Sequence, residues 1–89
     1  MKSATTKRFW KCFDALPDDI QRLAKAAFEK WRAKPGHPGL SFKPIRGLEG
    51  VYSVRIGIDW RAIGRRRGDT IYWVWIGSHA DYDAYLSRR

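Results

Sequence analysis

The spacing of apolar residues changes once along this 89-residue chain, and that change constrains the fold more than any other feature. Between residues 18 and 34 the apolar side chains recur at the three-to-four-residue period of an amphipathic helix. From residue 51 onward they recur at alternate positions, as in a strand with one buried face. Helices followed by antiparallel strands are typical of an α+β fold, in which the helices cover one face of the sheet.

The same pattern sets the expected element boundaries. Helices are predicted at residues 5–16, 18–34 and 81–87. Strands are predicted at residues 40–45, 51–58, 60–65 and 70–76, with a hairpin turn at 66–69. We therefore expect a single domain, residues 1–89, of the α+β class. Two N-terminal helices should pack on one face of a small, mainly antiparallel four-stranded sheet, followed by a short C-terminal helix.

The apolar stripes also predict the core. Leu23 and Ile58 continue the stripes of their elements, and the five tryptophans fall within apolar patterns, so we expect them mostly in the core. The strand at 70–76 is apolar or aromatic on both faces, which predicts a central strand covered on both sides. Only residues 1–4 precede the first helix. The sheet is therefore expected to keep an open edge, which a partner protein could fill, or a second copy of the chain to form a homodimer.

The charge balance indicates an anionic partner. Eighteen Lys and Arg residues stand against nine Asp and Glu residues, a formal net charge of +9. A polyanion relieves the repulsion among these cations and releases counterions on binding, so RNA, DNA or the ribosome is the expected partner class. The alternative is a protein whose cationic surface is simply solvated.

Other function classes are disfavoured by missing motifs. Cys12 is the single cysteine, which excludes an intrachain disulfide and a cysteine-based zinc site. The chain has no Gly-rich phosphate loop and no HExxH motif, so we expect neither a cofactor nor a metal site. Its N-terminus has no apolar signal segment, and residues 71–77, the longest apolar run, are too short to span a bilayer. We expect a cytoplasmic protein without a membrane partner.

Strand alternation gathers the candidate functional residues. Lys43, Arg55 and Arg61, with Ser53, sit opposite the main apolar set of three strands, so pairing of those strands would form a cationic patch away from the helices. Guanidinium forks and a lysine suit phosphate groups, and nearby aromatic rings can stack bases. The predicted RNA-binding residues are Lys43, Arg46, Arg65 and Arg66.

Such a patch suits RNA cleavage without a metal. In that reaction the 2′-OH attacks the adjacent phosphorus and the 5′-oxygen leaves, which requires a base, an acid and cations around the transition state. Histidine titrates near neutral pH and can serve as acid or base. The predicted catalytic residues are Arg55, Arg61, His79, Tyr82 and Tyr85.

Each candidate also has a structural interpretation. Arg55 and Arg61 could be salt-bridged or solvated strand residues. His79 could cap the last helix, and Tyr82 and Tyr85 could belong to the core. Residues 65–67 could form a solvated turn that adds only non-specific attraction.

Several short segments resemble the RelE/ParE toxin superfamily in order and spacing. They are Ile45-Arg46-Gly47-Leu48, Tyr52-Ser53-Val54-Arg55-Ile56, Trp60-Arg61-Ala62-Ile63 and the run from Trp73 to Tyr82. Together with the two N-terminal helices, the resemblance covers nearly the whole chain. It implies a sheet with helices packed on one side and an antitoxin protein that wraps and blocks the toxin.

In the RelE/HigB/YoeB-like branch, the resemblance implies metal-independent cleavage of mRNA on the ribosome. Arg46, Arg55 and Arg61 fall on basic family positions, and His79 falls where members carry Arg or His. Tyr85 falls on a C-terminal tyrosine position, with Tyr82 as a close competitor. Ser53 departs from the pattern, because some active members have a basic residue there.

Three functions are compatible with these residues. The leading hypothesis is a ribosome-dependent endoribonuclease toxin acting on mRNA. The second is a ParE-like toxin that poisons DNA gyrase by binding it, and the third is an RNA- or ribosome-binding domain without catalysis.

Overall fold

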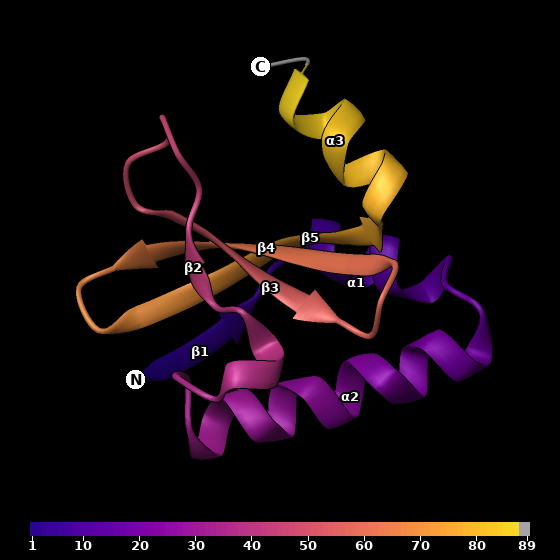
Figure 1. Cartoon of the computed structure of the whole chain (residues 1–89), viewed down its shortest axis with the longest axis horizontal. Coiled ribbons are helices and arrows are strands. Elements are labelled where there is room, and N and C mark those ends of the chain that lie inside the picture. The colour runs from indigo at the N-terminus through magenta and orange to yellow at the C-terminus, as the bar shows by residue number, and fades with distance from the viewer. Residues whose placement is uncertain (88–89) are drawn as a thin grey trace.

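The protein is a five-stranded sheet with two helices on one face and a third helix at the opposite face (Figure 1). A computed structural model describes residues 1–87. The elements in chain order are β1 (Lys2–Thr5), α1 (Lys7–Asp14), α2 (Asp18–Ala33), a 3₁₀ turn (Pro38–Leu40), β2 (Lys43–Pro44), β3 (Val51–Ile56), β4 (Trp60–Arg67), β5 (Thr70–Ser78) and α3 (His79–Ser87). The strand order is β1-β5-β4-β3-β2.

Local sequence signals set the limits of the first two helices. The hydroxyl oxygen of Thr6 accepts a hydrogen bond from the Phe9 N–H at 3.1 Å and so caps the N-terminus of α1. Pro17 separates the helices, and Asp18 and Asp19 occupy the first turn of α2, where the helix dipole favours carboxylates. The side-chain amide of Gln21 donates to the carbonyl groups of Phe13 and Leu16, which ties the first turns of α2 to the end of α1 and the turn after it.

The middle of the sheet is antiparallel. β4 pairs with β3 on one side and with β5 on the other, and a β-bulge interrupts the β4–β5 register at Ile63 and Gly64. At Gly64 a Cβ atom would lie 2.6 Å from the Ile71 Cγ2 atom and 3.0 Å from the Trp73 ring. Only glycine therefore allows β4 to run so close beneath these core side chains.

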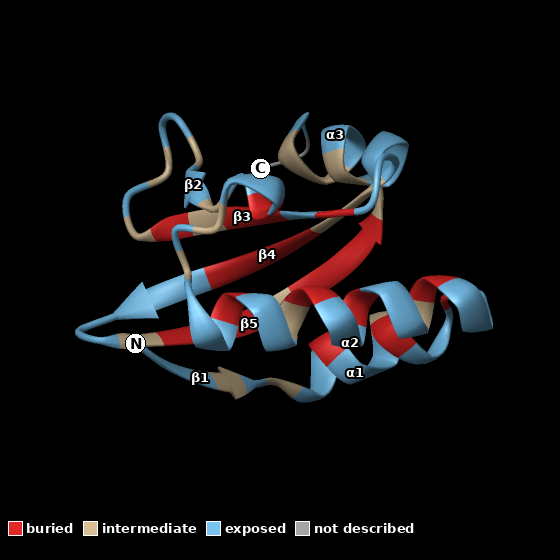
Figure 2. Cartoon of the chain, turned by 60° about the horizontal axis from the view of Figure 1, so that its bottom comes forward, coloured by how far each residue is buried: buried red, intermediate tan, exposed pale blue. Residues whose placement is uncertain are grey.

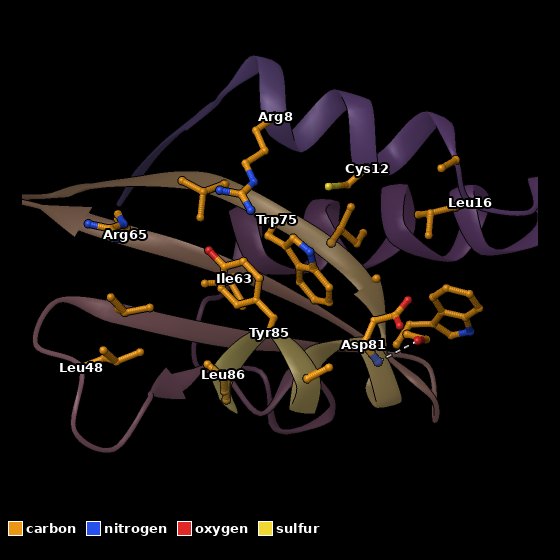
Figure 3. Close-up of a pocket in the computed structure, with 18 residues that line it drawn as sticks. Arg8, Cys12, Leu16, Leu48, Ile63, Arg65, Trp75, Asp81, Tyr85 and Leu86 are labelled. Carbon is orange, nitrogen blue, oxygen red and sulfur yellow. Dashed lines mark hydrogen bonds between the residues drawn. The ribbon is translucent and has the colours of Figure 1, made fainter. Parts of the chain in front are cut away.

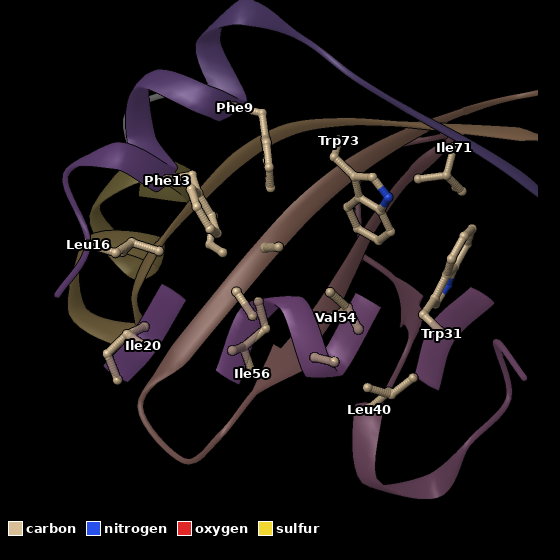
Figure 4. Close-up of a cluster of buried hydrophobic side chains, with 14 residues drawn as sticks. Phe9, Phe13, Leu16, Ile20, Trp31, Leu40, Val54, Ile56, Ile71 and Trp73 are labelled. Carbon is tan, nitrogen blue, oxygen red and sulfur yellow. The ribbon is translucent and has the colours of Figure 1, made fainter. Parts of the chain in front are cut away.

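The main core lies between the sheet and the pair α1–α2 (Figure 4). Trp31 of α2 and Trp73 of β5 are fully buried, with ring centroids 5.4 Å apart and planes at 80°. Such edge-to-face contacts stabilise aromatic pairs beyond their burial. Figure 2 shows the buried positions on the facing sides of the sheet and these two helices, whereas α3 has no buried residue.

The prediction of four strands is wrong, because residues 2–5 form a fifth strand. β1 pairs in parallel with β5, and the N–H groups of Lys2 and Thr6 donate to the carbonyl groups of Asp69 and Trp73. A strand of four residues is too short to produce an alternation signal, and its partner lies far away in the sequence. The expected open edge beside β5 is therefore occupied by the chain itself.

Several predicted boundaries and burials also need correction. Within the segment 40–45, Leu40 ends a 3₁₀ turn that begins at Pro38, and only Lys43–Pro44 pair as β2. β3 ends at Ile56, so Ile58 lies in a turn and is 78% exposed. Leu23 and Trp10 are about half exposed, although both fall within apolar patterns.

The boundaries of the last elements differ as well. β4 extends to Arg67, so the hairpin turn is shorter than predicted. At its other end, β5 extends to Ser78. α3 begins at His79, two residues before the predicted start. β5 lies between β1 and β4, next to the edge strand β1 rather than at the centre of the sheet. On the face turned away from α1 and α2, α3 covers only part of β5, so the expected cover on both sides is incomplete. Within residues 1–87, no helix is both long and apolar enough to cross a membrane.

Candidate functional site

The sheet face turned away from α1 and α2 carries most of the predicted site residues. Strand pairing places Lys43 beside Ser53, and Arg55 beside Arg61. Neither Asp nor Glu occurs in any of the five strands, whereas the strands contain seven basic residues. We call this surface the open face; its residues include Lys2, Lys43, Ser53, Arg55, Arg61, Ile63, Arg65, Arg67, Tyr72 and Trp75.

Arg55 and Arg61 form the closest cationic pair that the strand register creates. They are directly opposite each other on β3 and β4. The Arg55 Nε–H donates to the Gly57 carbonyl at 2.9 Å, and the Arg61 Nη1–H donates to the Trp60 carbonyl at 3.2 Å. Neither makes a salt bridge within residues 1–87, where the two ion pairs lie elsewhere. Because like charges directly opposite each other destabilise a sheet, this pair is suited to a bound anion.

His79 lies at the same end of the sheet as this pair. The backbone N–H of His79 donates to the backbone carbonyl of Asp59 at 2.6 Å, in the turn between β3 and β4. The Ser78 hydroxyl oxygen accepts from the Asp81 N–H at 3.1 Å, so Ser78 rather than His79 provides the side-chain cap of α3. The His79 ring is half exposed, and its Nδ1 lies 3.8 Å from an Asp83 carboxylate oxygen. The imidazole is therefore open to solvent and partnered by a carboxylate.

The two tyrosines of α3 occupy different positions. The Tyr82 ring is stacked on His79, with centroids 6.2 Å apart. The Tyr85 ring lies over Trp75 at 5.4 Å, and the guanidinium carbon of Arg8 lies 5.4 Å from the Tyr85 centroid (Figure 3). Tyr82 is thus next to the histidine, whereas Tyr85 lies over the middle of the open face.

A groove of about 900 Å³ separates α3 from the open face and from one side of α1. Trp75 and Ile63 form its buried floor, and Leu48 belongs to the same apolar cluster (Figure 3). Arg8 and Arg65 line it as cationic residues. An apolar floor with cations beside it can hold a base and its phosphate together.

The remaining predicted RNA-binding residues are more dispersed. Lys43 is exposed on the edge strand β2, opposite the buried Ser53. Arg46 is exposed in the β2–β3 loop. Arg65 is exposed on the open face, but Arg66 pairs with the core residue Ile71 and therefore points to the other side of β4.

Several open-face and groove residues were not among the predicted site residues. Arg67 continues the alternation of Arg61 and Arg65, but its segment was assigned to a turn. Tyr72 faces the same side and is 38% exposed. Arg8 reaches the groove from α1, an approach between distant segments that no local pattern could reveal. Among residues 1–87 no cluster of His, Cys, Asp and Glu could hold a metal ion.

Solved structures with the same fold define the class of this domain. The chain matches the RelE toxin of a RelB–RelE antitoxin–toxin complex from Methanococcus jannaschii with a TM-score of 0.76 and 23% identity, covering 93% of this chain and 98% of that one. It matches a YoeB/ParE toxin from Agrobacterium tumefaciens at 0.70 and 18% identity, covering 89% and 99%. The isolated E. coli RelE toxin matches at 0.67 and 13% identity, covering 98% and 96%. The fold is therefore that of the RelE-type toxins.

The family follows from the sequence itself. Residues 18–84, more than half of the chain, match the family model of the ParE-like toxin domain, so the chain belongs to that family. This result confirms the resemblance to the RelE/ParE superfamily. None of the curated proteins compared with the chain matches it.

Proposed function

We propose that this protein is the toxin of a toxin–antitoxin system and that it cleaves mRNA on the ribosome without a metal ion. The observation that carries the proposal is the pairing of Arg55 and Arg61 on strands that lack any carboxylate, next to the solvent-exposed His79. A dianionic phosphorane-like transition state carries more negative charge than the phosphodiester, so paired guanidinium groups stabilise it selectively.

In this mechanism each residue has a defined task. Arg55 and Arg61 hold the non-bridging oxygens of the reacting phosphate. His79 either removes the proton of the 2′-OH or protonates the leaving 5′-oxygen, water carries out the other proton transfer, and Asp83 lies 3.8 Å from the His79 Nδ1 atom. Tyr82, stacked on His79, is close to the proton-transfer step, whereas Tyr85 lies where a base would stack.

The test is expression of the protein in a short pulse, followed by primer extension on translated mRNAs. We expect growth arrest and cuts at positions occupied by ribosomes. Arg61→Gln should lower the cleavage rate about 10²–10³-fold, the effect of removing one transition-state donor. Arg66→Gln removes the same charge from the other side of β4 and should cleave normally. Unchanged cleavage in an Arg61→Gln, His79→Ala double variant would refute this site.

The second candidate is a toxin that binds DNA gyrase, and the ParE-like family match supports it. A gyrase poison would produce DNA breaks and leave mRNA intact. Assays for DNA breaks and for mRNA cuts on the same cultures separate the two candidates.

We also propose that an antitoxin protein binds this chain, supported by the RelB–RelE complex among its structural matches. A segment that blocks the toxin would have to cover the open face. Because the strands carry only positive charge, acidic residues are expected in that segment.

A further inference from the structure

The open face has a second cationic cluster at the end of β4 opposite Arg61. Arg67 of β4, Thr70 of β5 and Lys2 of β1 form one row across three strands. In the next row Arg65 lies beside Tyr72. Lys2, Arg65 and Arg67 are exposed, and they make no salt bridge among residues 1–87. We call Lys2, Arg65, Arg67 and Tyr72 the hairpin-end cluster.

Tyr72 gives this cluster an aromatic surface. Tyr72 is 38% exposed, with Arg65 on one side and the small Ala4 on the other. Neighbouring aromatic positions of β5 are buried, since Trp73 packs in the main core and Trp75 forms the groove floor. An exposed ring flanked by a guanidinium group suits the face of a nucleobase whose phosphate the arginine holds.

Spacing relates the cluster to the proposed reaction site. Arg65 and Arg67 follow Arg61 by four and six residues on one strand, or about 13 and 20 Å at the usual rise per residue. A single phosphate group cannot contact both Arg61 and Arg67 across that distance. Between the ends lies the groove floor of Ile63 and Trp75, on which Tyr85 now rests.

We propose that the hairpin-end cluster is a second RNA subsite, which holds a phosphate and stacks a base of the same strand that is cleaved beside Arg55 and Arg61. This inference rests on the proposed function. The RNA strand runs along β4, and the hairpin-end cluster positions the RNA without contacting the reacting phosphate. Tyr72 supplies stacking, and Arg65 and Arg67 bind phosphate. Charge complementarity favours a polyanion here, because Asp69 in the turn is the sole carboxylate between β4 and β5.

The experiment measures binding of the full chain to single-stranded RNAs carrying 2′-O-methyl groups, which cannot attack the phosphate. Fluorescence anisotropy compares a dinucleotide with an octanucleotide over a range of salt concentrations. The octanucleotide should bind more tightly. Tyr72→Ala should lower its affinity about 5- to 150-fold, the usual effect of removing the stacking partner of one base. Tyr72→Phe keeps the ring and should retain the affinity.

Arg65 and Arg66, neighbours on β4 that point to opposite sides of the sheet, provide a matched pair of variants. Arg65→Gln should weaken octanucleotide binding and reduce the salt slope by about 0.7 for each phosphate that is no longer neutralised. Arg66→Gln removes an equal charge that points to the other side of β4, so its effect should be clearly smaller. Equal reductions of affinity in the two variants, no effect of Tyr72→Ala, or no binding of any RNA would each overturn the subsite.

The cleavage assay separates this inference from the proposed function. Normal octanucleotide binding by the hairpin-end variants, combined with loss of cleavage in Arg61→Gln, would reject the subsite and keep the nuclease. Length-dependent binding that requires Tyr72 and Arg65, in a protein that never cuts mRNA, would keep the subsite and reject the nuclease.

Discussion

Replacing Arg55 and Arg61 by glutamine, singly and together, measures the repulsion between the two guanidinium groups that face each other across β3 and β4. Directly opposite residues have Cβ atoms about 5 Å apart. Coulomb's law gives about 0.6 kcal/mol for two unit charges about 7 Å apart in water. We therefore expect a repulsive coupling energy of about 0.2–1 kcal/mol from the double-mutant cycle.

The cycle cancels the loss of the two hydrogen bonds to backbone carbonyls, because each single variant removes its own bond as well. Urea unfolding followed by tryptophan fluorescence provides the four free energies without adding salt. At about 1 M NaCl the Debye length is about 3 Å, so the coupling should nearly vanish.

A bound anion should reverse the sign of this coupling. Sulfate at matched ionic strength is expected to raise the Tm of the wild-type protein more than that of the double variant, since both arginines hold one anion. Zero or attractive coupling at low salt would refute the argument that Arg55 and Arg61 form a phosphate-binding pair. Equal effects of sulfate on the wild-type protein and the double variant would refute it as well.

Three further predictions concern stability. Gly64→Ala should cost about 1–3 kcal/mol in urea unfolding, because the new methyl group collides with Ile71, whereas Gly36→Ala adds a methyl group in open space and should change little. Thr6→Ala should cost about 0.5–2 kcal/mol through loss of the α1 cap, and Thr6→Ser should restore most of it in the same assay. Trp75→Ala should cost about 3–5 kcal/mol and speed amide hydrogen exchange in α3; unchanged exchange there would show that the helix does not depend on this ring.

The regular parts of the fold could be predicted because their signals are local. α2 repeats apolar residues over sixteen positions, and β3 and β4 alternate strictly enough to predict that Arg55 and Arg61 share a face. β1 could not be predicted in the same way. Its four residues carry no period, and its pairing with β5 depends on an approach across nearly seventy positions.

The site residues, like the elements of the fold, could be predicted only where a local sequence pattern marks them. Alternation identifies the arginines of the open face, but it cannot tell where a strand ends, so Arg67 was assigned to a turn. The stacking of Tyr82 on His79 and of Tyr85 on Trp75 depends on how α3 turns back over the sheet. That direction is set by tertiary packing, which the helical spacing of Tyr82 and Tyr85 does not determine by itself.

The central claim is that RNA lies on the open face of the sheet, and amide chemical-shift mapping tests it most directly. Titration of the ¹⁵N-labelled protein with an uncleavable RNA octanucleotide should shift the amides of β3, β4 and β5, with the largest changes near Arg55, Arg61 and Tyr72. The exposed side of α2 should stay unchanged and serves as the internal control. Shifts concentrated on α1 and α2, with the strands unaffected, would contradict the account.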